Sequence, residues 1–144
     1  MSQITLALSK KLIEAAEQEA VKINVPMVIS IVDSGGNLVA CHRMDEALLV
    51  SVDIAQNKAW TSIAMKMPTE NLAQATGSGK ELFGINTTNN GRVVIFGGGI
   101  PLIKDNQIIG AIGVSGGSVK EDIRVAKAAV DMLSNLSKAA SIAD

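Results

Sequence analysis

The chain has 144 residues and a formal net charge of −1 at pH 7, and its basic and acidic residues are interspersed. With one Trp, two Phe and no Tyr, it lacks the basic face and the aromatic stacking platforms of nucleic-acid-binding proteins, so we expect no nucleic-acid partner. Its single cysteine, Cys41, excludes an intramolecular disulfide and a cysteine-rich metal cluster.

The length predicts a single domain over residues 1–144. Residues 1–20 carry Glu and Lys at helical intervals and lack the apolar core of a signal peptide. Since no apolar run reaches the length of a membrane span, we expect a cytoplasmic protein with no membrane partner.

The first third of the chain predicts a helix followed by a β-hairpin. Apolar residues recur at helical spacing from Thr5 to about Lys22. Residues 27–33 (MVISIVD) and 38–43 (LVACHR) have the apolar character of strands, and the intervening SGGN is typical of a turn.

The middle of the chain predicts a second helix and a long loop. Helical spacing returns from Ser51 to Met65, and Pro68 ends it. Thr69 is expected to cap a short turn, TENLAQA. Residues 76–91 are rich in Gly and Asn, which is typical of a surface loop.

The last part of the chain predicts three strands and a helix. Residues 92–96 (RVVIF) form the first expected strand. Residues 102–104 and 107–115 form a hairpin around Asp105-Asn106, a pair that tolerates positive φ. A final helix is expected from Ser118, because Glu121 follows at the spacing of a capping box.

Strands joined by short hairpins imply an antiparallel sheet, so we predict an α+β fold of five strands rather than a βαβ nucleotide fold. Residues 27–33, 92–96 and 108–114 are apolar on both alternating sets of positions, so both faces of the sheet must be covered. Three long helices are few to cover both faces of a five-stranded sheet. Mean hydropathy is also high for a small monomer, at +0.29, and we therefore expect a homo-oligomer.

The glycine-rich stretches do not match phosphate-binding motifs. The glycines of 110–116 are spaced by three, unlike the dinucleotide fingerprint, and residues 77–81 (GSGKE) lack the first glycine and final Ser or Thr of a P-loop. The run at 97–99 suits a bulge or sharp bend, with ligand contact through the backbone of Gly98 and Gly99 as the alternative.

His42 is the only histidine, so a multi-histidine zinc site is excluded. A single imidazole can still serve as the axial ligand of haem iron, and the alternative is a histidine with no ligand. Beside it, Arg43 and Asp45 form either a salt bridge or a site in which Arg43 pairs with a ligand carboxylate. Lys58 belongs either to a solvated stripe of its helix or to the wall of a cleft.

Four motifs together resemble the GlcG/HbpS-type family, which also supplies the C-terminal domain of PduO-type cobalamin adenosyltransferases. They are MVISIVDSGGNLVACHRMDEA, AQNKAWTSIAMKMPT, NGRVVIFGGGIPL and IIGAIGVSGGSVKED, in the family's order. The resemblance runs from about Thr5 to Leu133 and is greatest to the stand-alone, OrfY-like members that accompany glycerol or diol dehydratases.

The resemblance implies a profilin-like fold with an antiparallel five-stranded sheet, self-association, haem binding in several members and slow haem degradation in some. It does not carry over adenosyl transfer, which belongs to the other domain of PduO proteins. Of the candidate residues, Arg43, Asp45, Lys58, Gly98 and Gly99 match the family pattern. His42 is the candidate metal ligand by elimination.

Three hypotheses follow. The first is a cytoplasmic homo-oligomer that binds haem or another tetrapyrrole through His42, with Arg43 and Lys58 at the propionates, and assists cobalamin-dependent diol or glycerol utilisation. The second is an assembly partner of the dehydratase components with no ligand. The third is a haem-degrading enzyme; we predict no catalytic side chain of the protein itself.

Overall fold

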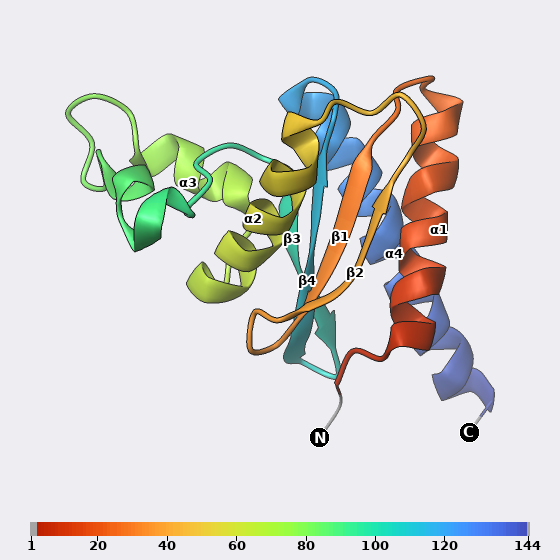
Figure 1. The fold of residues 1–144 in the computed structure, drawn as a ribbon. Helices are drawn as coiled ribbons and strands as arrows, with labels where there is room; N and C mark the ends of the chain where they lie inside the picture. The colour runs from red at the N-terminus through yellow and green to blue at the C-terminus, as the bar shows by residue number, and fades with distance from the viewer. Residues whose placement is uncertain (1–2, 144) are drawn as a thin grey trace.

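The computed structural model describes residues 3–143 and contains one antiparallel sheet of four strands. The order is β2-β1-β4-β3, and the strands are β1 (Val28–Asp33), β2 (Leu38–Arg43), β3 (Gly99–Lys104) and β4 (Gln107–Ser115). Strands β2 and β3 are therefore the edges (Figure 1). The α+β antiparallel architecture is confirmed.

The prediction of a fifth strand at residues 92–96 is wrong. The hydroxyl of Thr61 donates to the carbonyl of Arg92 (3.3 Å) and accepts from the amide of Val94 (3.0 Å). The Arg92 guanidinium also lies 4.4 Å from the ring centre of Trp60. This segment is thus bound to side chains of a helix, and the edge strand begins only at Gly99.

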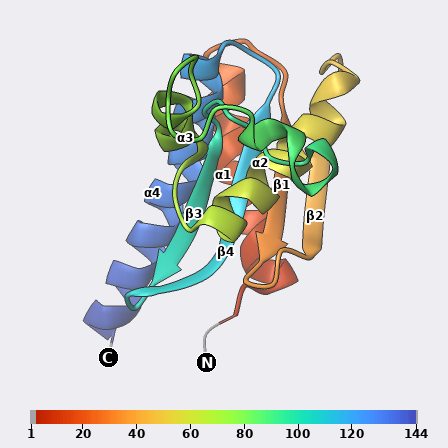
Figure 2. The same ribbon diagram turned by 90° about the vertical axis from the view of Figure 1, so that its left-hand side faces the viewer.

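Helices cover both faces of the sheet. Helices α1 (Leu6–Lys22) and α4 (Val119–Ala143) pack on one face, and α2 (Val50–Met65) packs on the other (Figures 1 and 2). The short helix α3 (Thr69–Ala75), with the one-turn helices η1 (Ile85–Thr87) and η2 (Asn89–Gly91) beyond it, projects to one side of this body.

The two-sided burial predicted for residues 27–33 is confirmed. Ile29 and Ile31 belong to the core shared with α1 and α4, whereas Val28 and Val32 pack on the α2 side. The helices of one chain therefore bury β1 from Val28 to Val32 and β4 from Ile109 to Ser115. Edge strand β2 is left partly open, with Leu38 and His42 exposed.

Local signals set the element ends largely as expected. Ser118 and Glu121 form the reciprocal capping box, with bonds of 2.9 and 3.2 Å, and Asp105 and Asn106 both have positive φ in the β3–β4 turn. Thr69, however, does not cap α3, because Pro68 occupies the cap position and the Thr69 hydroxyl accepts from the amide of Gly99 (2.9 Å).

Within the residues described, no helix combines the length and the apolar character needed to cross a membrane.

Candidate functional site

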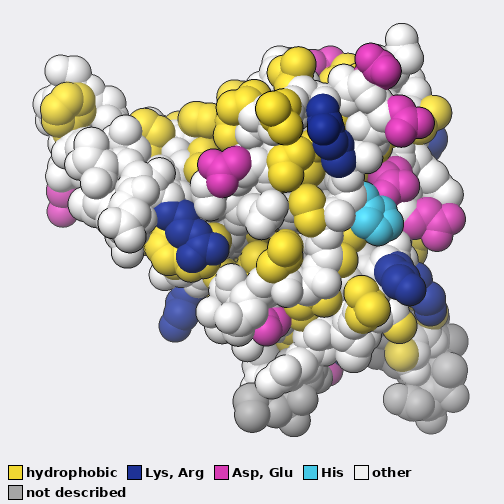
Figure 3. All heavy atoms as spheres, viewed as in Figure 1, with side chains coloured by type: hydrophobic (Ala, Val, Ile, Leu, Met, Phe, Trp, Pro, Cys, Tyr) yellow, Lys and Arg dark blue, Asp and Glu magenta, His cyan; other side chains and the backbone are white. Residues whose placement is uncertain are grey.

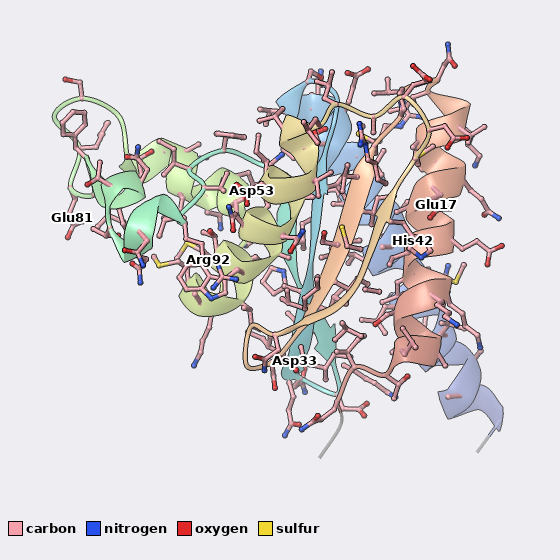
Figure 4. The ribbon with its side chains drawn as sticks, in the orientation of Figure 1. Glu17, Asp33, His42, Asp53, Glu81 and Arg92 are labelled. Carbon is pink, nitrogen blue, oxygen red and sulfur yellow. The ribbon has the colours of Figure 1, made fainter. Side chains whose placement is uncertain are left out.

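His42 lies on the open edge of the sheet and faces helix α1. It pairs with Ile29 in the β1–β2 ladder, and its side chain is 49% exposed. Its Nδ1 lies 2.6 Å from Oε1 of Glu17, a residue of α1 (Figure 4). When Nδ1–H donates to this carboxylate, Nε2 carries the lone pair and is the ring nitrogen able to bind a metal.

The imidazole opens into a hollow of about 610 Å³, which we call the His42 hollow. Its lining residues are Glu17, Cys41, His42, Arg43, Met44 and Asp45. Two of its groups are already engaged: Cys41 Sγ accepts from the Ser30 hydroxyl (3.1 Å), and Met44 Sδ accepts from the Met27 amide (3.4 Å). Both sulfur atoms of the hollow are therefore already in hydrogen bonds, and His42 is its one nitrogen donor of the kind that ligates haem iron.

Of the two alternatives for Arg43, the salt bridge with Asp45 is not among the ion pairs of the described residues. Its Nε and Nη2 donate to the carbonyl of Ala47 at 3.2 and 2.8 Å. These bonds fix the chain as it turns from β2 toward α2, and they hold the guanidinium at the wall of the His42 hollow. Its outer edge can still receive a carboxylate of a ligand.

An apolar run follows directly after this turn. Leu48, Leu49 and Val50 are 58, 74 and 59% exposed, which is unusual for three consecutive large hydrophobic residues. Figure 3 shows hydrophobic side chains gathered over the start of α2, on the same face of the molecule as the histidine and the acidic side chains beside it. This apolar run is a surface that association would bury.

The donor set limits which metal the site can hold. Within residues 3–143, no group of three His, Cys, Asp or Glu side chains is arranged to hold a metal ion. A bare ion would therefore lack ligands. A haem iron arrives with four ligands from its own ring and needs one axial donor, which His42, with Glu17 behind it, can supply.

Lys58 is completely buried, so the expectation of a solvated stripe is wrong. Its Nζ lies 2.8 Å from Oδ2 of Asp122 and donates to the carbonyl of Val114, also at 2.8 Å. The ring centre of Phe96 lies 5.1 Å from the same ammonium. Burial lowers the pKa of Lys58 and raises the pKa of Asp122, and the mutual attraction of the two charges opposes both shifts.

Gly98 and Gly99 belong to this buried cluster. A Cβ on Gly98 would lie 2.6 Å from Lys58 Nζ, and one on Gly99 would overlap the Lys58 carbonyl oxygen. Gly98 also has φ +127°, which a side chain would strain. These glycines let the chain bend tightly against α2.

The candidate residues thus separate into two groups. His42, Arg43 and Asp45 line the His42 hollow, whereas Lys58, Gly98 and Gly99 form the buried cluster, and none of these three lines the hollow. Sequence reasoning missed Glu17 and Asp122. The sequence did offer a signal for Asp122, because it directly follows the capping-box residue Glu121. In the structure its Oδ1 accepts from the amide of Gly117 (2.9 Å). The sequence offered no such signal for Glu17, because Glu17 contacts His42 only when α1 packs beside β2.

Comparison with known proteins identifies the family. The model of the family described as haem degrading protein HbpS-like matches residues 4–131. A 15.0 kDa protein in the dhaT–dhaS intergenic region of Citrobacter freundii is 46% identical over 136 residues, which cover 94% of this chain and 96% of that protein. The corrinoid adenosyltransferase PduO of Citrobacter freundii is 43% identical over 120 residues, 83% of this chain but 36% of PduO.

Two solved structures are similar along nearly the whole chain. OrfY of Klebsiella pneumoniae superposes with a TM-score of 0.90 at 45% identity and covers 93% of both chains. The PduOC:heme complex superposes with a TM-score of 0.87 at 40% identity and covers 90% of this chain and 94% of that one. The resemblance inferred from the four sequence motifs is confirmed.

Proposed function

Since the chain belongs to the HbpS-like family, we propose that it is a cytoplasmic, homo-oligomeric protein that binds haem or a related tetrapyrrole. The observation that carries the proposal is the His42–Glu17 pair, whose 2.6 Å bond leaves Nε2 for a ligand at the hollow. A relative at 40% identity with a closely similar fold forms a haem complex, which supports the choice of ligand.

Four residues of the hollow have distinct parts in this proposal. His42 Nε2 binds the iron, and Glu17 fixes the tautomer and orientation of the ring and raises its basicity. Arg43 pairs with a propionate, and Asp45 sets the polar rim. When bound, the haem supplies the redox chemistry of its iron, and the protein supplies the orientation and the polarity around it.

The homo-oligomer in this proposal completes the pocket. The His42 hollow is open and offers one wall, whereas a tetrapyrrole has two broad apolar faces to remove from water. The exposed run Leu48-Leu49-Val50, which begins just beyond the Arg43–Ala47 bonds, is the apolar surface that a second copy would bury. Self-association thus joins the apolar run and the hollow in one interface.

The cellular role that we propose is an accessory one in cobalamin-dependent diol or glycerol utilisation. It is supported by similarity to part of a corrinoid adenosyltransferase and to a 15.0 kDa relative that the match covers over 96% of its length. Haem degradation is a second candidate function, favoured by the description of the family. In that case bound haem would lose its absorption band, in the presence of a reductant, faster than haem on albumin.

The test is a haemin titration followed by visible spectroscopy, with cobalamin run in parallel. We expect a saturable Soret shift with the unchanged protein and with the control Glu81→Ala, which changes an exposed residue of the projecting segment. His42→Ala should abolish the shift, because it removes the axial nitrogen. Glu17→Gln should weaken binding about 10-fold, the lower end for a residue that orients a metal ligand.

Identical spectra for His42→Ala and the unchanged protein would remove His42 from the site. Absence of a shift with both haemin and cobalamin would overturn the proposal and favour a ligand-free assembly partner of the dehydratase components.

A further inference from the structure

A second concave site lies at the opposite edge of the sheet, between strand β3 and the C-terminal half of α4. Figure 2 shows α4 running beside β3, and here the surface forms a groove of about 740 Å³, which we call the β3–α4 groove. Its apolar lining residues are Pro68, Ile100, Pro101, Ile103, Ile108, Val130 and Leu133. The volume lies within the range of small-molecule sites.

The charges around this groove are mostly positive. Lys66, Lys104 and Lys138 line it, and Asp105 is the one acidic residue among its lining residues. Asp131, on the same helix, lines a different hollow together with Arg124. A chain of net charge −1 thus has a local positive excess beside an apolar groove.

From this arrangement we infer that the β3–α4 groove binds a small amphipathic anion, such as a carboxylate on an aliphatic or aromatic body. The body lies against the isoleucines of β3 and β4 and against Leu133, and the carboxylate lies among the lysine ammonium groups. Lys104 comes from β3, Lys138 from α4 and Lys66 from the cap position just after α2, so flexible side chains can close on a head group from several directions.

This site is independent of the one proposed for haem. The β3–α4 groove and the His42 hollow share no lining residue. The groove is also lined by no His, Cys or Met, so it offers none of the usual side-chain ligands for a haem iron. The chemistry of the two sites is therefore different, and they can be tested separately.

The test is calorimetric titration with dodecanoate below its micelle concentration, at low ionic strength, beside dodecyltrimethylammonium. We expect saturable binding of dodecanoate and none of the cation. The double variant Lys104→Gln/Lys138→Gln should weaken dodecanoate binding about 10-fold, as should added salt. Lys80→Gln, an exposed residue of the projecting segment, is the matched control and should bind as the unchanged protein does.

A third variant, Ile103→Glu, places a negative charge at a residue that is 57% exposed, so folding should be retained. It should abolish dodecanoate binding and leave both the haemin titration and the sedimentation coefficient unchanged. Equal binding of the two detergents, no saturable binding, or indifference to the lysine variants would overturn the inference. So would an Ile103→Glu protein that dissociates into smaller species without any dodecanoate effect, since the groove would then be an interface between copies.

Discussion

Replacing Lys58 by Met should lower the free energy of unfolding by about 3–5 kcal/mol. The ammonium is fully buried, and it neutralises an Asp122 carboxylate whose side chain is only 5% exposed. Met has a similar length and shape, so the substitution changes packing little and removes the charge. The loss arises because Asp122 is then left in the interior without a counter-charge, and the Val114 carbonyl loses a donor.

A double variant tests whether charge is the cause. Lys58→Met/Asp122→Asn removes both charges, yet Asn can still accept from the amide of Gly117 through its side-chain oxygen. We expect this protein to recover most of the stability lost by Lys58→Met, because a buried ion pair contributes little beyond its own desolvation cost. Urea unfolding of the four proteins of the cycle measures the coupling. A single variant that costs less than about 1 kcal/mol would show that the pair is not an essential element of the fold.

The pH dependence of stability gives a second measure of the same pair. Burial raises the pKa of Asp122 above its usual 3.8, so its stabilising contribution is lost as the pH rises through the folded-state pKa. Burial lowers the pKa of Lys58 below its usual 10.5, so its contribution is present above 10.5 and is lost as the pH falls through the folded-state pKa. The stability of the unchanged protein, compared with that of the double variant, should therefore be lowest at pH values between these two transitions. A difference in the free energy of unfolding that does not change with pH would contradict both pKa directions.

The buried pair could not be predicted from the sequence. The residues around Lys58 have the pattern of an ordinary helix, and none of them indicates that this side chain points toward the end of β4. Its partner is 64 positions away. Only the fold brings Lys58 and Asp122 together. The helix position that the sequence predicts to be solvent-exposed is therefore buried in the structure.

Local chemistry was predictable where it acts over a few residues. The capping box at Ser118, the positive-φ pair at Asp105-Asn106 and the apolar strands each depend on neighbours in sequence, and the structure has all three. The prediction of a strand at 92–96 is wrong because the conformation of this segment depends on a contact that is distant in sequence. The carbonyl of Arg92 and the amide of Val94 both bond to the Thr61 hydroxyl of α2 instead of to a neighbouring strand, and an apolar pattern alone does not distinguish these two outcomes.

The same distinction applies to the candidate site. His42 could be selected as the single imidazole of the chain, and Arg43 and Asp45 by their nearness in sequence. Glu17, whose carboxylate lies 2.6 Å from His42 Nδ1, comes from another element. Lys58, Gly98 and Gly99 share the family's motifs with these residues, but the structure places them in a packing cluster. Shared motifs therefore identify the fold more reliably than they identify the ligand contacts.

The glycines of β4 provide the second large effect. Replacing Gly113 by Ala should lower the free energy of unfolding by about 3 kcal/mol or more, at the upper end of what overpacking a core costs. A Cβ at this position would overlap the carbonyl oxygen of Ala55 and lie 2.6 Å from the amide nitrogen of Ala59. Both atoms are backbone of α2, so relief requires the whole helix to move away from β4, against the apolar contacts that hold it there.

Gly77→Ala is the matched control for this variant. Gly77 is exposed, and its added Cβ would have only an ordinary contact of 3.6 Å with the Lys80 side chain. The control should therefore change stability by less than about 0.5 kcal/mol. Urea unfolding compares the two proteins, and soluble yield at low temperature serves if Gly113→Ala does not fold at room temperature. Equal midpoints would show that α2 does not need a glycine beneath it, and the glycine pattern of 110–116 would then require a ligand-based explanation in place of a packing one.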